Sequence, residues 1–218
     1  MRAIRWRMAG WVFTVEHTVA YGQAMATLTA HDWVLAAMRR LSTHGVDHIR
    51  VEPLAVQLGV SKGSFYWHFP NRDALLTAVL DLWQSQGTEA IITAVDAEPP
   101  GSEARLHVLI QQTFGQPQHD GIELGIRAWA TRDATARTVV EKVDARRLDY
   151  VTGLLRQYGL SKHTARTRAE LMYRTLIGEF TLRSHGHPPL DAAALQALLA
   201  AMVAPHPSTA TDSGKFVS

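Results

Sequence analysis

The chain of 218 residues contains no cysteine. Disulfide bonds and thiolate metal sites are therefore excluded, and this composition is typical of a cytoplasmic protein. No stretch of 18 or more consecutive apolar residues occurs, so we expect no membrane-spanning helix and no membrane partner. Neither sign of charge dominates, since the formal net charge is only +2. Bulk charge is thus only a mild indication of a polyanionic partner.

The usual short motifs of enzymes are also absent. The sequence has no G-x-S-x-G elbow, no H-E-x-x-H, no P-loop and no G-x-G-x-x-G, so an enzyme is the weaker interpretation. Eleven histidines invite a metal site, and His185-x-His187 is the best pair. No acidic or thiolate ligands accompany that pair, so we expect no metal and no cofactor.

The residues that are present favour helices. Hydrophobic residues make up 46% of the chain, alanine and leucine are frequent, and glycine and proline are widely spaced. This composition is typical of an all-α globular protein. Periodicity and capping residues predict about nine helices, over residues 30–44, 51–58, 62–69, 71–97, 103–114, a segment after the 115–121 loop up to 130, then 133–158, 161–184 and 191–203.

These helices group into a small head and a larger body. We expect an N-terminal extension at 1–28, a head at 29–75, a body at 76–204 and a flexible tail at 205–218. The extension superficially resembles an export signal, because arginines precede the apolar stretch Met8 to Val15. Glu16 and His17 interrupt that stretch, so we favour a poorly packed extension or a true start at Met25.

The segment from Leu54 to Leu76 carries the most specific pattern in the chain. Small Ala55 suits a close helix crossing, and Gly59 suits a sharp turn because glycine tolerates positive φ. Val60 fills the gap between two helices, and Ser61 offers a side-chain cap to the second. This is the helix-turn-helix pattern, whose second helix enters the DNA major groove.

Further residues at fixed spacing make the pattern more specific. They are Ala36-Ala37, Leu41, Gly45, Leu54-Ala55, Leu58-Gly59-Val60-Ser61, Tyr66-Trp67-His68-Phe69, Asn71-Arg72 and Leu75-Leu76. Residues 29–83, about a quarter of the chain, resemble the DNA-binding domain of the TetR family of bacterial transcriptional repressors. The resemblance implies a helical head and body, a homodimer, operator DNA as partner and no catalytic activity. It also implies an unidentified small-molecule inducer that releases a repressor; an activator or a nucleoid-like DNA-coating protein remains an alternative.

The second helix of the motif should read bases near its N-terminus. Lys62 and Ser64 would face the groove, where Lys62 can donate to guanine, and Gly63 would let the backbone approach closely. Resemblance assigns phosphate contacts to Tyr66, His68 and Arg72. The full set of predicted DNA contacts is Arg50, Ser61, Lys62, Gly63, Ser64, Tyr66, Trp67, His68 and Arg72. Tyr66 and His68 could instead pack the head, and Phe65 and Phe69 are expected in its core.

One position departs from the family pattern. A small hydroxyl residue usually opens the first helix of the motif, whereas this chain has Arg50-Val51-Glu52-Pro53 there. Arg50 could take over the phosphate contact. Glu52 would repel DNA unless it is turned away or paired.

The body should hold the inducer pocket and the dimer interface. Resemblance implies a pocket, and the aromatic and polar candidates for its wall are Trp83, His107, Phe114, Arg127, Trp129, Tyr150 and Tyr173. Glu123 and Arg127, four residues apart, could simply pair on a helix surface. Apolar and small residues follow one face of each of the last two helices and predict a four-helix dimer contact through Leu171, Thr175, Gly178, Leu182, Leu195, Leu198, Leu199 and Met202. Those faces could also cover the subunit's own core.

Overall fold

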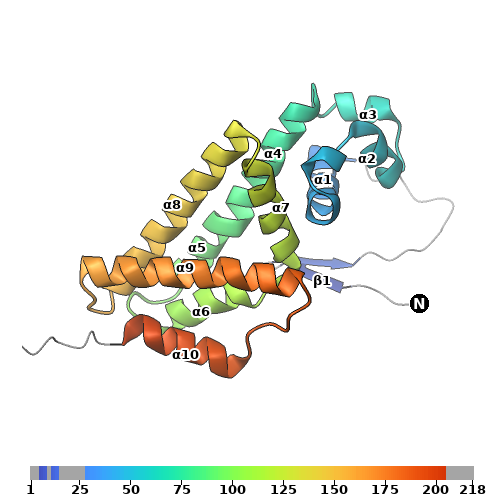
Figure 1. The fold of residues 1–218 in the computed structure, drawn as a ribbon. Helices are drawn as coiled ribbons and strands as arrows, with labels where there is room; N and C mark the ends of the chain where they lie inside the picture. Colours follow the sequence, from blue (N-terminus) through green and yellow to red (C-terminus); the bar gives the residue numbers. More distant parts are fainter. Residues whose placement is uncertain (1–4, 9–10, 15–27, 205–218) are drawn as a thin grey trace, which may run out of the picture.

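The computed structural model describes residues 5–8, 11–14 and 28–204 (Figure 1). The other residues of the predicted extension, including the alternative start at Met25, and the predicted tail at 205–218 lie outside the described residues. Within the described part, the chain forms a head at one corner of a larger helical body. The all-α fold class is confirmed for this head and body.

The head consists of three helices and one short 3-10 turn. A capping box starts the first helix, since the Thr29 hydroxyl accepts from the Asp32 amide and the Asp32 carboxylate accepts from the Thr29 amide. Gly59 adopts φ 70° at the motif's turn, as expected. The last helix ends three residues earlier than predicted, and the chain then turns towards Pro70. The elements are α1 (Ala30–His44), η1 (Val46–His48), α2 (Val51–Leu58) and α3 (Lys62–Tyr66).

The body begins with a long rod that leaves the head. This rod joins α4 (Arg72–Gln84), a π-helical turn η2 (Ser85–Glu89) and α5 (Ala90–Asp96) without a break. Asn71 caps it by accepting from the Ala74 amide. Counting the rod as one helix gives nine helices in the described residues, as predicted. The remaining elements are α6 (Glu103–Phe114), the 3-10 turn η3 (Pro117–His119), α7 (Asp120–Ala130), α8 (Ala134–Arg156), α9 (Lys162–Ser184) and α10 (Ala192–Val203).

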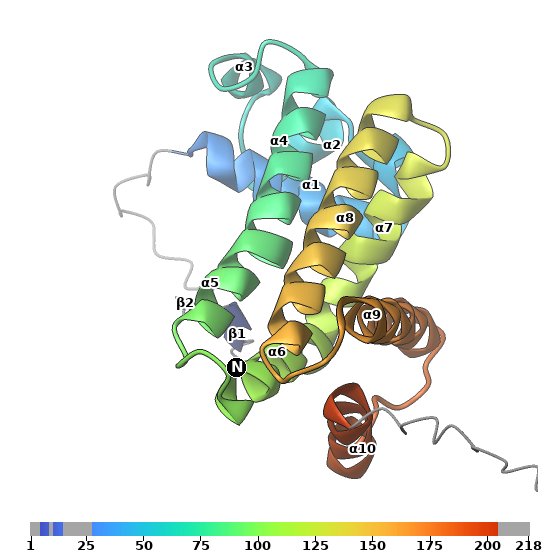
Figure 2. The same ribbon diagram turned by 90° about the vertical axis from the view of Figure 1, so that its left-hand side faces the viewer.

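The helices of the body form layers. The α4–α5 rod runs beside α8, and α9 crosses below them (Figure 2). Helix α10 lies beneath α9 and packs on α6 and α9. The rod therefore reaches from the head to α6 in the lower half of the body.

A two-stranded hairpin precedes the helices. Strands β1 (Arg5–Met8) and β2 (Trp11–Thr14) pair antiparallel, with Arg5 opposite Thr14 and Met8 opposite Trp11. This hairpin lies within the predicted extension at 1–28, whose packing stays a prediction. Aromatic and β-branched residues in β2 favour an extended backbone, which gives a physical reason for the hairpin.

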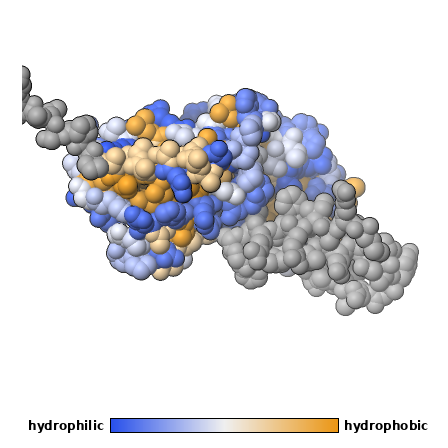
Figure 3. All heavy atoms as spheres, turned by 90° about the horizontal axis from the view of Figure 1, so that it is seen from below, coloured by the Kyte–Doolittle hydropathy of each residue, from blue (hydrophilic) through white to orange (hydrophobic). Residues whose placement is uncertain are grey.

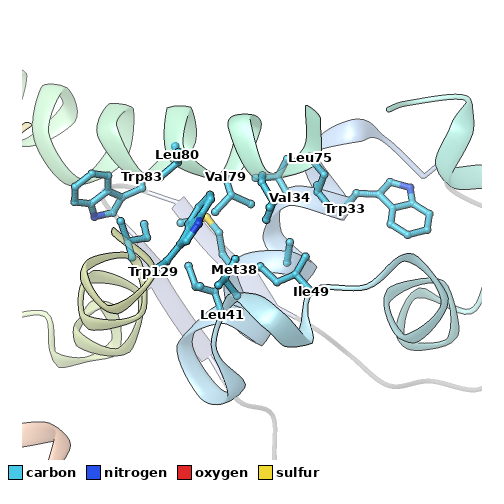
Figure 4. Packing of buried hydrophobic residues seen from close by; sticks show 14 of the residues in the cluster. Trp33, Val34, Met38, Leu41, Ile49, Leu75, Val79, Leu80, Trp83 and Trp129 are labelled. Atoms are coloured by element: carbon cyan, nitrogen blue, oxygen red, sulfur yellow. The ribbon is translucent and has the colours of Figure 1, made fainter. Parts of the chain in front are cut away.

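Two apolar clusters form the interior. The upper cluster unites the head with α4, α7 and the first half of α8, and includes Trp33, Leu41, Leu75, Trp83 and Trp129 (Figure 4). The lower cluster joins α5, α6, α9 and α10 with the second half of α8. Because the upper cluster runs along α4 through Leu75, Leu76 and Val79, it crosses the predicted boundary between residues 75 and 76.

Helices α1 and α7 cross closely where the head meets the body. A Cβ atom on Gly125 would lie 3.0 Å from both the Leu41 carbonyl oxygen and Leu41 Cγ. A Cβ atom on Gly121 would lie 3.1 Å from the Ser42 carbonyl oxygen. A Cβ atom at either position would force α1 and α7 slightly apart, so the spacing Gly121-x-x-x-Gly125 favours this close crossing of head and body.

Candidate DNA-binding head and ligand cavity

The surface of α3 presents aromatic side chains to solvent. Trp67 is 89% exposed and Tyr66 is 54% exposed, whereas Phe65 and Phe69 are buried, as expected. Phe65 contacts Trp33 edge to face, with ring centroids 5.2 Å apart, and this contact anchors α3 to α1. The anchoring rings hold α3 so that Lys62, Gly63 and the two exposed aromatic residues lie on the outside.

Glu52 of α2 is paired with Lys62 of α3. Lys62 Nζ lies 2.5 Å from Glu52 Oε1, and both side chains are more than half exposed. The hydrogen bond from Lys62 is the main reason why the pKa of Glu52 is lowered, and it raises the pKa of Lys62. The sequence left open whether Glu52 is paired or would repel DNA. In the structure it is paired, and its partner is Lys62, the residue predicted to read bases.

Two predicted DNA-contact residues, Arg72 and Ser61, have surroundings that differ from the prediction. The Arg72 guanidinium donates from Nε to the Ile49 carbonyl at 2.6 Å and from Nη2 to the Val46 carbonyl at 2.8 Å. Arg72 therefore ties the start of α4 to η1 and its C-cap. Only the N–H groups that do not bond these two carbonyls could make the predicted phosphate contact. Ser61 occupies the N-cap position of α3, but its side chain makes no capping hydrogen bond, so that predicted cap is wrong.

The other predicted DNA contacts differ in exposure. Arg50 is exposed and precedes α2, where its Nε donates to the Asp47 carbonyl at 3.3 Å. Ser64 and His68 are half-buried at the edge of α3. Their contacts with DNA stay predictions.

A cavity of about 1020 Å³ lies between the upper and lower clusters. This volume is at the upper end of the range of about 300–1,000 Å³ that is typical of small-molecule sites. Its wall is mostly apolar and includes Met38 from α1, Ile122 from α7 and Met172 from α9. The π-helical turn supplies Gly87 and Thr88, so the irregular part of the rod faces the cavity.

The wall includes only some of the predicted pocket residues. Trp83, Tyr150 and Tyr173 line the cavity. Phe114 and Trp129 are instead buried in the lower and upper clusters, because their rings fill the apolar interior. His107 is exposed on α6, where its Nδ1 contacts the Glu103 carbonyl, so its predicted place in the pocket is wrong.

Arg127 lies behind the wall in a buried network of polar groups. Its Nε donates to Glu123 Oε1 at 2.9 Å, and its Nη2 donates to Asp144 Oδ1 at 2.7 Å. The predicted pairing of Glu123 with Arg127 therefore occurs, but not on a helix surface, since Glu123 is only 6% exposed.

Glu123 is the centre of this network. Its carboxylate also accepts from Trp83 Nε1 at 2.8 Å and from Arg147 Nη1 at 3.0 Å. Burial would raise the pKa of Glu123, but the guanidinium groups of Arg147 and Arg127 outweigh burial and lower it. Burial raises the pKa of Tyr173 to about 12, so its hydroxyl keeps its proton at neutral pH.

Four wall residues were not predicted from the sequence: Arg147, Glu123, Thr88 and His119. Charged residues on helices usually face solvent, and Arg147 follows Arg146, which is half-exposed and pairs with Glu89 on the surface. The amphipathic pattern of α7 places Glu123 near its buried face, which is the one signal available beforehand.

The predicted dimer residues divide into two groups. On α9, Leu171 and Leu182 are 56% and 48% exposed, and Thr175 and Gly178 are exposed on the same face. On α10, Met202 is buried in the lower cluster of its own subunit, so its predicted interface role is wrong. Leu195, Leu198 and Leu199 also pack partly against that cluster. Hydrophobic spheres gather on the face of the body seen from below (Figure 3).

The described residues also bear on two other classes of site, a membrane span and a metal centre. No helix there is both long and apolar enough to cross a bilayer. In the same ranges, no three His, Cys, Asp or Glu side chains converge in a way that would hold a metal ion.

Comparison with known proteins agrees with the geometry of the head. Residues 34–79 match the sequence model described as "Bacterial regulatory proteins, tetR family". The tetracycline repressor protein class A from transposon 1721 of Escherichia coli is 27% identical over 122 residues, which are 54% of this chain and 56% of that protein. The regulator EthR of Mycolicibacterium smegmatis is 27% identical over 105 residues, or 48% and 43% of the two chains. The chain thus spans about half the length of the curated relatives it matches.

A solved structure extends the likeness to the body. The transcriptional regulator FadR from Bacillus subtilis, in complex with stearoyl-CoA, superposes with a TM-score of 0.62 at 18% identity, covering 81% of this chain and 99% of that one. At this identity the superposition shows the shared fold alone. Together, the motif residues and the matched sequence model show that residues 34–79 are similar to the tetR family of bacterial regulatory proteins, and the helical body shares its fold with a solved regulator.

Proposed function

We propose that this protein is a transcriptional repressor that binds an operator through α3 and is released when a small molecule enters the cavity. The observation that carries the DNA-binding part is the exposed face of α3, where Tyr66 and Trp67 face solvent beside Lys62. Large aromatic side chains on a surface indicate a binding face. A regulator with this role acts in the cytoplasm, where the chromosome lies.

The proposed DNA complex needs two copies of the chain. The exposed face of α9, with Leu171 and Leu182, and the outer face of α10 are the surfaces offered to a second subunit. A homodimer presents two α3 helices to successive major grooves, whose centres lie about 34 Å apart. Lys62 then reads base edges, while Tyr66, His68 and Arg50 contact phosphates.

The rod formed by α4, η2 and α5 is the proposed connection between ligand and DNA. Its first residue, Arg72, holds the head through two carbonyl groups, and Trp83, three turns further on, donates to Glu123 at the cavity wall. A ligand that binds one orientation of the rod better shifts the population towards it. The distance between the two heads then no longer fits the operator. The tetracycline repressor and the FadR complex with stearoyl-CoA support a small molecule in this role.

The test of DNA binding begins with sequencing of genomic fragments that the protein retains, followed by footprinting on the fragments found. We expect protection of a discrete palindrome, whereas uniform protection of all DNA would indicate a coating protein and contradict the proposal. Lys62→Ala should weaken binding and relax the preference for one base pair. Lys162→Ala is a matched control, since Lys162 also follows a serine N-cap at the first position of a helix, at the far end of the body.

A further inference from the structure

The cavity contains two charged side chains, Glu123 and Arg147, which a ligand would be expected to meet. Arg147 has five N–H groups, and five hydrogen bonds already use them. Nε donates to Thr88 Oγ1 at 2.9 Å, and the Nη groups donate to the Gly87 carbonyl, the Tyr173 hydroxyl and both Glu123 oxygens at 3.0–3.3 Å. A ligand carboxylate at Arg147 would therefore have to displace a partner that is already in place.

Glu123 is equally occupied. A carboxylate offers about four acceptor positions. Oε1 accepts from Arg127 Nε and Arg147 Nη1, and Oε2 accepts from Trp83 Nε1 and Arg147 Nη2. The Tyr173 hydroxyl accepts from both arginines and donates to Asp144 Oδ1 at 2.6 Å. An ammonium group of a ligand would find no acceptor free at the centre of this network.

The charges of the network also cancel. Arg127 and Arg147 are balanced by Glu123 and Asp144, and the raised pKa of Tyr173 keeps that hydroxyl neutral. A formal charge brought into this apolar cavity would stay without an opposite partner, which costs much more than burying a neutral polar group.

We propose that the cavity selects uncharged ligands, with an apolar body and a neutral hydrogen-bonding group such as an amide, a hydroxyl or a ketone. This inference rests on the proposed function, since it concerns the inducer of that same cavity. Gln112, Gln116 and His119 line the cavity near one another in sequence and supply neutral groups that donate and accept. Burial lowers the pKa of His119, so its imidazole is neutral at pH 7 and adds no charge.

The main experiment measures binding of three matched probes to the wild-type full chain at pH 7 by isothermal titration calorimetry. The probes are octanamide, octanoate and octylammonium, which share one chain length and differ in charge. We expect octanamide to bind at least about tenfold more tightly than either ion, because an unpaired buried charge costs more than about 1.4 kcal/mol. An ion that binds as tightly as octanamide overturns the proposed selectivity and leaves the ligand site intact. Failure of all three probes to bind overturns the ligand site itself, and with it the release step of the proposed function.

Paired variants show whether binding occurs in the cavity. Ala94 lines the cavity, and Ala97 at the end of the same rod does not. Ala94→Phe should abolish octanamide binding, whereas Ala97→Phe should retain it. Equal retention by both variants would place the probe elsewhere and contradict the proposal.

Two further variants unbalance the network in opposite directions. Glu123→Gln leaves an excess positive charge and should shift the preference towards octanoate by about tenfold. Arg147→Gln leaves an excess negative charge and should shift it towards octylammonium. An unchanged preference in folded protein of either variant would overturn charge balance as the cause of selectivity. The wild-type comparison decides the proposal if neither variant folds.

Discussion

The ion pairs Lys62–Glu52 and Arg147–Glu123 each join a basic side chain to a glutamate carboxylate, but one pair is exposed and the other is buried. The first joins α3 to α2 on the surface of the head, where water screens both charges. The second joins α8 to α7 inside the body, where both side chains are buried among further hydrogen-bond partners. In the proposed DNA complex, the surface lysine would exchange its carboxylate for DNA at little cost. The buried arginine already has a hydrogen-bond partner for each of its N–H groups, so its contacts set the shape and charge of the cavity wall.

Loss of the buried arginine should have the largest effect. Arg147→Met removes two donors from Glu123 and leaves that carboxylate insufficiently paired, which should lower the free energy of unfolding by about 3–5 kcal/mol. The neighbouring Arg146→Met is the control, because Arg146 pairs with Glu89 at 3.2 Å on the surface and should cost less than about 1 kcal/mol. Urea denaturation followed by circular dichroism measures both. Equal decreases in the free energy of unfolding for the two variants would show that the buried pair Arg147–Glu123 contributes no more than the surface pair Arg146–Glu89.

The close crossing of α1 and α7 connects the head to the body, and a methyl group added at Gly125 should destabilise it. Gly125→Ala should lower the free energy of unfolding by about 1–3 kcal/mol, because the Leu41 backbone cannot move aside easily. Gly153→Ala on α8 meets no atom within 4 Å and should instead stabilise by about 0.4–1 kcal/mol. Thermal denaturation of the two variants measures the contrast. A neutral Gly125→Ala would indicate that the head is not held rigidly at this crossing.

Acid should weaken the buried pair. Because the pKa of Glu123 is lower in the folded state than its unfolded value of about 4.3, its stabilisation is complete above that value and is lost as the pH falls through the folded-state pKa. The difference in free energy of unfolding between wild type and Glu123→Gln should therefore narrow from pH 7 to pH 3. Urea denaturation at both pH values measures it. A constant difference would show that the pKa of Glu123 is the same in the folded and unfolded states and would contradict the lowered pKa.

Removal of the surface carboxylate should have the smallest effect on stability. Glu52→Gln should leave the free energy of unfolding unchanged, since both side chains of the pair with Lys62 are more than half exposed. Operator affinity should rise by about two- to tenfold, because Lys62 is released and one negative charge near the phosphates disappears. Fluorescence anisotropy at several salt concentrations measures this. Weaker binding would mean that Glu52 positions Lys62 for DNA instead of competing with it.

The head could be predicted closely from the sequence. The bounds of α1 and α2 agree with the predicted residues, because Thr29, Gly45 and Gly59 act through local backbone chemistry. The length of α3 was less accurate, since Phe69 is held by tertiary packing against Phe65, with ring centroids 5.6 Å apart, and not by helix propensity. Arg72 was assigned to phosphate because nothing local reveals that the carbonyls of η1 lie within its reach.

The wall of the cavity could be predicted only in part. Trp83 and Tyr173 were among the candidates, but size and aromatic character did not distinguish them from Trp129 and Phe114, which fill the apolar interior. His107 faces solvent, although its residue type suits a pocket. The wall depends on which faces of α1, the rod, α6, α7, α8 and α9 converge, and contacts such as that between Glu123 and Arg147 join residues far apart in the chain.

The sequence by itself determined the helices, the helix-turn-helix motif and the resemblance of the head to a known family, because caps, turns and apolar periodicity act over a few residues. Only the tertiary structure decided which charges are buried together and where the cavity lies. Four ionic side chains from α7 and α8 meet beneath the rod, with Trp83 and Tyr173 completing their hydrogen bonds. The energy of such a network depends on distances and on exclusion of water, and both arise only when distant helices pack.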